Sequence, residues 1–88
     1  MAQPRRWLNE VIDAIHDLGG DANLVDIYAQ VRRRDIMDFD ANPNWEARIR
    51  GTLETHSSDS KAYKPRNPDC FRSVYGIGQG RWALREGY

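Results

Sequence analysis

Residues suited to binding a polyanion are concentrated between residues 42 and 66 of this 88-residue chain. Guanidinium and ammonium groups neutralise phosphates, while short hydroxyl and amide side chains bind phosphate oxygens or base edges. A solvated helix face followed by a loop in which Ser and Asp make only local backbone hydrogen bonds is the competing interpretation. The candidate binding residues are Asn42, Asn44, Trp45, Ala47, Arg48, Arg50, Gly51, His56, Ser57, Ser58, Asp59, Ser60, Lys61, Tyr63, Lys64 and Arg66.

Catalytic and metal chemistry finds less support in the sequence. His56, Asp59 and the adjacent serines are neighbours, but a catalytic triad is a spatial arrangement with an oxyanion hole, which nothing here supplies. The single cysteine, Cys70, excludes an internal disulfide and a cysteine-based zinc site, and it favours a reducing, intracellular compartment. Neither His16 nor His56 has a second ligand at metal-binding spacing. We therefore expect no enzyme activity in these 88 residues, no metal site and no cofactor.

Composition predicts one small globular domain over residues 1–88. Hydrophobic residues make up 40% and charged residues 30%, a balance typical of a folded chain. No apolar run is long enough for a leader or a membrane span, so we expect a cytoplasmic protein with no membrane partner. The formal net charge is zero, but residues 1–44 carry −3 and residues 45–88 carry +3. The basic half is where a polyanion would bind, unless chance alone produced the asymmetry.

Hydrophobic periodicity predicts two helices in the first part of the chain. Apolar residues at helical spacing follow Pro4, a residue favoured near a helix start, and indicate a helix over residues 5–18. A second, shorter apolar stripe indicates a helix over residues 24–34, capped by Asp21 or Asn23. The arginines that end this second helix fit a solvated helix terminus better than a DNA contact, because cations are favourable there.

A third helix is predicted over residues 43–55, with Asn42 as its cap and Pro43 as its first residue. Its inward face would carry Trp45, Ile49 and Leu53, and its opposite face Ala47, Gly51 and Glu54, flanked by Arg48 and Thr55 on one side and Arg50 on the other. A glycine inside a helix costs about 1 kcal/mol relative to alanine. Close approach of a ligand or another backbone would explain Gly51.

The last part of the chain predicts a β-hairpin. Residues 71–75 and 81–85 have strand patterns, and the glycine-rich segment 76–80 between them is typical of a hairpin turn. A two-stranded hairpin is not stable alone, so it must pack on the helices. Three helices closed by a C-terminal hairpin predict an α+β, mainly α fold of the winged helix-turn-helix type, whose third helix enters the major groove.

Several segments resemble the winged-helix modules attached to methylation-dependent bacterial restriction endonucleases. The run Ile49-Arg50-Gly51-Thr52-Leu53-Glu54-Thr55-His56-Ser57-Ser58-Asp59-Ser60, then Phe71 and Val74, and the run Gly78-Gln79-Gly80-Arg81-Trp82-Ala83-Leu84-Arg85 carry this resemblance. The chain is similar, more distantly, to HARE-HTH domains through Trp7-Leu8, Asp26-Ile27-Tyr28 and the terminal Gly-x-Trp-x-Leu strand.

The resemblance implies binding of double-stranded DNA and the reading of N6-methyladenine in the major groove, where the adenine N6 position lies. Ala47 and Gly51 would leave room for the methyl group, and Trp45 or Tyr63 would form an apolar wall. The polar contacts would come from Asn42, Asn44 or the Ser57–Ser60 segment. The resemblance also implies a bacterial, nucleoid-associated protein that is either a free-standing reader or one module of a larger protein. Because the chain begins with Met1, a fused nuclease would follow Tyr88.

Two other functions fit the same pattern. The weakly charged face of Ala47, Gly51 and Glu54 also suits docking of a protein partner. A repressor that binds unmodified operator DNA as a dimer would need an exposed apolar patch, for which Ile36, Met37 and Phe39 are the candidates. We expect the isolated domain to be a monomer. DNA binding would weaken steeply as salt rises, in contrast to protein docking.

Overall fold

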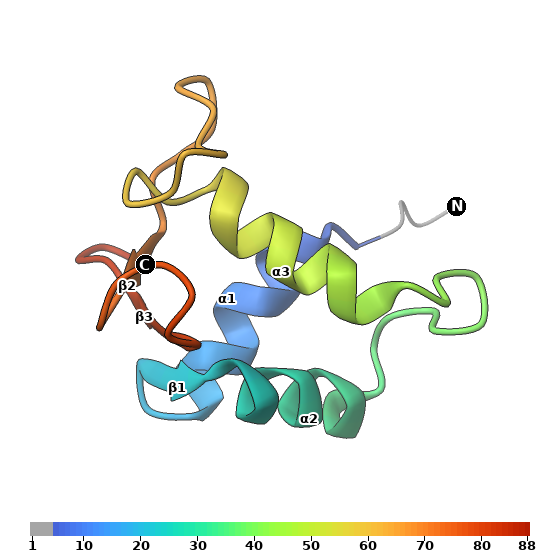
Figure 1. Ribbon diagram of the computed structural model, residues 1–88. Coiled ribbons are helices and arrows are strands. Elements are labelled where there is room, and N and C mark those ends of the chain that lie inside the picture. Colours follow the sequence, from blue (N-terminus) through green and yellow to red (C-terminus); the bar gives the residue numbers. More distant parts are fainter. Residues whose placement is uncertain (1–4) are drawn as a thin grey trace.

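The computed structural model describes residues 5–88, which form three helices and three short strands (Figure 1). The helices are α1 (Trp7–Asp17), α2 (Leu24–Arg34) and α3 (Trp45–Thr55), and the strands are β1 (Asp21–Asn23), β2 (Phe71–Ser73) and β3 (Arg81–Leu84). The strands make one antiparallel sheet in the order β1-β3-β2. The predicted class, α+β and mainly α, is confirmed. No helix of residues 5–88 is long and apolar enough to cross a membrane.

The predicted bounds of α2 are confirmed, whereas the two other helices start later than expected. α1 begins at Trp7, and Pro4, the expected start signal, lies outside the described residues. α3 begins at Trp45, so Pro43 is not helical and Asn42 does not cap the helix. The Asn42 amide instead donates to the carbonyl of Asp38 at 2.8 Å, which uses this side chain to close the preceding turn.

The sheet has a strand that the sequence did not predict. Asp21 or Asn23 was expected to cap α2, but residues 21–23 form β1, which pairs with β3. Asn23 does precede α2, yet its side chain makes no capping hydrogen bond and accepts from the Arg81 guanidinium at 3.2 Å. A three-residue Asp-Ala-Asn segment has no intrinsic strand preference, so its conformation comes from pairing with a distant strand.

The core lies where α1 packs against α2, α3 and the sheet. The inward face predicted for α3 is confirmed for Ile49 and Leu53, which have no exposed surface. Trp45 is half-buried and packs on the edge of this core. The other completely buried apolar residues are Val11, Ala14, Ile15, Ile27, Val31, Cys70 and Phe71.

The segment between β2 and β3 is the glycine-rich turn that the sequence predicts. We call residues 74–80 the glycine loop. Gly76, Gly78 and Gly80 have φ values of 97°, 90° and 77°, which only glycine adopts readily. Both flanking strands are shorter than predicted, because pairing ends at Ser73 and Leu84. The peptide N–H of Leu24 donates to the Gly80 carbonyl, so the glycine loop lies at the start of α2.

Candidate nucleic-acid interface

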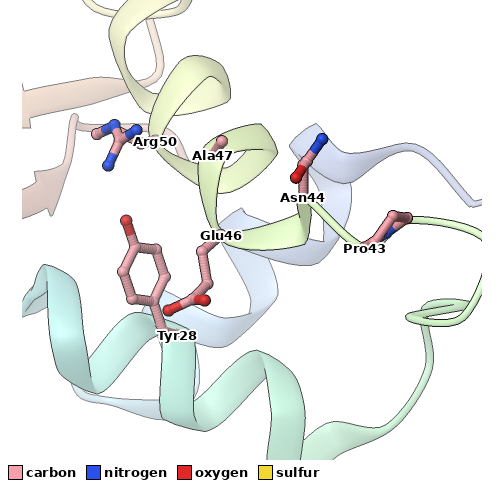
Figure 2. A pocket seen from close by; sticks show the side chains of 6 residues that line it. All are labelled: Tyr28, Pro43, Asn44, Glu46, Ala47 and Arg50. Carbon is pink, nitrogen blue, oxygen red and sulfur yellow. The ribbon is translucent and has the colours of Figure 1, made fainter.

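A row of hollows follows α3 on the side that faces α2 and the glycine loop. The first, of about 320 Å³, lies between α2 and the start of α3 and is lined by Tyr28, Pro43, Asn44, Glu46, Ala47 and Arg50 (Figure 2). The second, of about 190 Å³, is lined by Leu24, Arg50, Glu54, Gly78, Gly80 and Trp82. The third, of about 480 Å³, is lined by Glu54, Asp59, Ser60, Lys61, Ala62 and Ile77.

These three hollows are neighbours that share lining residues, and we call them together the α3 furrow. Arg50 lines both the first and the second hollow, and Glu54 lines both the second and the third. The furrow therefore brings α2, the outer face of α3, the glycine loop and the loop after α3 together along one helix. The predicted binding residues that line it are Asn44, Ala47, Arg50, Asp59, Ser60 and Lys61.

The outward face of α3 is open as the sequence predicts. Ala47, Arg48 and Arg50 are exposed, and a methyl group built on Gly51 would meet no atom within 4 Å. Nothing inside the fold therefore requires a glycine at position 51. The cost of about 1 kcal/mol relative to alanine is not offset by internal packing.

Two serines of the predicted binding segment are buried and serve the loop. The Ser57 side chain has no exposed surface, and its Oγ accepts from the Asp59 N–H at 3.3 Å. Ser60 is 9% exposed, and its Oγ accepts from the Ala62 N–H at 3.1 Å. For these two side chains the competing interpretation, local backbone hydrogen bonding, is the one that the geometry bears out.

Ser58 binds the far end of the loop after α3, and Asp59 binds that loop to β2. Ser58 donates to Asp69 through its N–H at 2.9 Å and its hydroxyl at 2.6 Å. Partial burial opposes ionisation of Asp69, but the hydrogen bonds from Ser58 and the charge of Arg85 outweigh it, and the pKa of Asp69 is lowered. Asp59 accepts from the Ser73 N–H at 2.9 Å and pairs with Arg85 at 3.3 Å. Both carboxylates therefore act within the fold.

The remaining predicted residues are divided between the fold and the surface. His56 is half-buried, with its Nδ1 2.9 Å from the Thr52 carbonyl oxygen, and Tyr63 donates to the Asn67 carbonyl at 3.2 Å.

Asn42 lies apart from the α3 furrow, in a hollow that Trp7 and Met37 also line. Trp45 stacks edge-on against Phe39 and Tyr28, with ring centroids 5.2 and 6.0 Å apart. Lys61, Lys64 and Arg66 are exposed.

Internal ion pairs leave a positive excess in the second half of the chain. Within residues 5–88 they involve six of the thirteen acidic side chains but only four of the thirteen basic ones. The basic side chains of residues 45–88 that form no ion pair there are Arg48, Arg50, Lys61, Lys64, Arg66 and Arg72. The formal net charge of zero therefore conceals a surplus of cations available to a ligand near α3.

Sequence reasoning missed the α2 and glycine-loop walls of the furrow. Tyr28 and Leu24 belong to the apolar stripe that predicted α2 and were given no binding role, while Ile77 was only a turn residue. The apolar patch suggested for a dimer is also reduced. Phe39 packs on Trp45 and lies under the Arg32 guanidinium, 4.5 Å from its ring centroid. Met37 is half-buried, so only Ile36 of the three is exposed.

No family model, curated protein or solved structure matches this chain. In the part of the chain that the structure describes, no group of three His, Cys, Asp or Glu side chains is arranged to hold a metal ion. The geometry and charge of the α3 furrow are therefore the features that bear on function.

Proposed function

We propose that this chain is a winged-helix domain that binds double-stranded DNA and reads N6-methyladenine through α3. The observation that carries the proposal is the outward face of α3. It combines small residues, Ala47 and Gly51, with arginines on both flanks, and the open space at Gly51 has no internal explanation. A helix with a small central face lies close to base edges, while flanking arginines reach phosphates or the guanine O6 and N7 atoms.

The positions of the other elements support this proposal. In a winged helix the hairpin lies beside the recognition helix, and here Gly78 and Gly80 share a hollow with Arg50 and Glu54 of α3. The glycine loop would then be the wing. The third strand, β1, pairs with β3 on the edge away from β2 and connects directly to α2.

The preference for a methylated base rests on the residues at the centre of the face. A methyl group on adenine N6 projects into the major groove and needs an apolar space beside it. Ala47 offers an exposed methyl surface and Gly51 offers room, while the Asn44 amide at the helix start can bind the polar base edge. Trp45 is less suited to the role of wall, because its ring is engaged by Phe39 and Tyr28.

Docking of a protein partner is the second candidate function, and two carboxylates favour it. Glu46 and Glu54 line the α3 furrow on either side of Arg50, and neither forms an ion pair within residues 5–88. Carboxylates repel phosphates, so a furrow with this charge pattern would also suit a basic protein surface.

Fluorescence anisotropy distinguishes these functions. The domain is titrated into matched duplexes that are unmodified, contain N6-methyladenine or contain 5-methylcytosine, over a series of salt concentrations. We expect affinity at least tenfold higher for the N6-methyladenine duplex, which is about 1.4 kcal/mol, and affinity that falls as salt rises. Equal binding to all three would contradict methyl reading, and absence of binding would favour the protein-docking function.

The matched variants are Arg50→Ala in the furrow and Arg33→Ala as the control. Both remove one exposed guanidinium, but helical spacing puts Arg33 on the side of α2 away from Tyr28, where it donates to Gln30 at 2.8 Å. Arg50→Ala should weaken DNA binding severalfold, whereas Arg33→Ala should leave it nearly unchanged. Equal effects of the two variants would show that only overall charge matters.

A further inference from the structure

One buried polar atom in the described part of the chain lacks a hydrogen-bond partner. It is the hydroxyl oxygen of Tyr28, on α2. A buried hydroxyl without a partner is unfavourable, and in most folds such a group is paired with protein or water. The presence of this hydroxyl therefore needs an explanation outside the internal hydrogen bonds of the fold.

Packing explains the ring of Tyr28 but not its hydroxyl. The ring meets Trp45 of α3 edge-on, with centroids 6.0 Å apart and planes at 81°, and Trp45 in turn meets Phe39 at 5.2 Å. These contacts are made by the aromatic rings alone. A phenylalanine at position 28 would make the same contacts without burying an unpaired oxygen.

The hydroxyl end of Tyr28 is directed across the first hollow of the furrow toward Arg50 of α3 (Figure 2). Arg50 is exposed, and within residues 5–88 its guanidinium forms no ion pair. Two donors from different helices thus converge on one hollow of about 320 Å³, beside the exposed start of α3.

We propose that Tyr28 and Arg50 together bind one phosphate of the DNA backbone at the crevice between α2 and α3. This inference rests on the proposed DNA binding and names a contact within it. In helix-turn-helix domains the helix before the recognition helix crosses the backbone, and tyrosine hydroxyls and guanidinium groups both donate to phosphate oxygens. A phosphate that enters the hollow between the two side chains would pair with the Arg50 guanidinium and accept from the Tyr28 hydroxyl.

Glu46 lies in the same hollow, and the proposal predicts that its replacement strengthens DNA binding. Its carboxylate lines the same hollow and repels a phosphate there. Glu46→Gln removes that repulsion while keeping the shape of the side chain, so it should tighten DNA binding severalfold. Tyr28→Phe and Arg50→Gln should weaken it.

The decisive test combines Tyr28→Phe with DNA in which single phosphates are replaced by neutral methylphosphonates. We expect the variant to keep or raise the thermal midpoint and to bind unsubstituted duplex about tenfold more weakly than the wild type. With the methylphosphonate at one particular position, the two proteins should bind equally, because the hydroxyl then has lost its charged acceptor. Arg50→Gln should lower the salt slope by about one unit, and Tyr28→Phe should not change it.

Two results would overturn the inference while leaving DNA binding intact. One is equal affinity of the wild type and Tyr28→Phe for unsubstituted duplex. The other is a penalty of Tyr28→Phe that stays the same for every methylphosphonate position, which would place the hydroxyl on a base or make its role structural. Failure of the wild type to bind any duplex would instead refute the proposed function itself.

Discussion

Arg34, the last residue of α2, donates to both carboxylate oxygens of Glu10 on α1, from Nε at 2.7 Å and from Nη2 at 3.3 Å. The Glu10 side chain has no exposed surface, and its Oε1 also accepts from Arg5 Nε at 3.1 Å. Arg34 also pairs with Asp17 at 2.8 Å. The arginine run at the end of α2 was interpreted as solvated, and for Arg34 that interpretation is wrong, because this side chain joins two helices.

Removal of Arg34 should therefore destabilise the domain strongly. Arg34→Ala leaves a buried carboxylate with one partner instead of two, and loss of a partner from a buried ion pair costs about 3 kcal/mol. Arg33→Ala, one residue away and exposed, should change the free energy of unfolding by less than about 0.5 kcal/mol. Urea unfolding followed by circular dichroism compares the two, and equal effects would contradict the assigned role of Arg34.

Substitution of Gly51 should separate stability from binding. Gly51→Ala places a methyl group in open space and improves helix propensity, so it should stabilise the domain by about 1 kcal/mol, or a thermal midpoint roughly 4–8 °C higher. Gly51→Leu should also fold, but its side chain would hold α3 away from the base edges and abolish DNA binding. Calorimetry measures stability and anisotropy measures DNA binding on the same samples. Unimpaired DNA binding by Gly51→Leu would show that α3 is not part of the DNA interface.

Acid should destabilise the domain through Asp69 and Asp17. Partial burial opposes ionisation of Asp69, but hydrogen bonds from Ser58 and the charge of Arg85 outweigh it and lower the pKa of Asp69 from its ordinary value of 3.8. A hydrogen bond from Arg34 lowers the pKa of Asp17 from the same ordinary value. A folded-state pKa below the unfolded one contributes stability above the unfolded value, and this contribution is lost as pH falls through the folded pKa.

The thermal midpoint should therefore fall as the pH is lowered below about 4. Asp69→Asn should lower the midpoint at pH 7 and flatten its dependence on pH in the acid range. Thermal scans between about pH 2 and about pH 7 measure both the midpoint and its dependence on pH, because this interval includes the ordinary pKa of an aspartate. An unchanged pH dependence in Asp69→Asn would show that this carboxylate contributes nothing to acid unfolding.

Ser58 and Lys61 should give contrasting phenotypes although both lie in the loop after α3. Ser58→Ala removes the 2.6 Å hydrogen bond to Asp69 and should destabilise by about 1–2 kcal/mol, with DNA affinity of the folded fraction little changed. Lys61→Ala removes an exposed cation that lines the α3 furrow, so it should weaken DNA binding and leave stability unchanged. If Ser58→Ala weakened DNA binding and Lys61→Ala lowered stability instead, the serine segment would belong to the binding surface.

The three helices and their inward faces were predictable because helical periodicity is a local property of the chain. Ile49 and Leu53 recur one turn apart, and that spacing alone places them on the same buried side of α3. The glycine loop was predictable for a similar reason, since three closely spaced glycines allow backbone angles that other residues avoid. The face that Gly51 shares with Ala47 followed from the same helical arithmetic.

Only the tertiary structure decided what depends on partners distant in the sequence. Residues 21–23 form the strand β1 because they pair with β3, where Asp21 lies opposite Ala83. The Ser58 side chain is engaged within the fold because it donates a hydrogen bond to Asp69. The unpaired hydroxyl of Tyr28 appears only when α2 is set against α3. Local propensity fixes the angles of one segment, but hydrogen bonds, ion pairs and hollows between segments depend on how the helices and strands pack together.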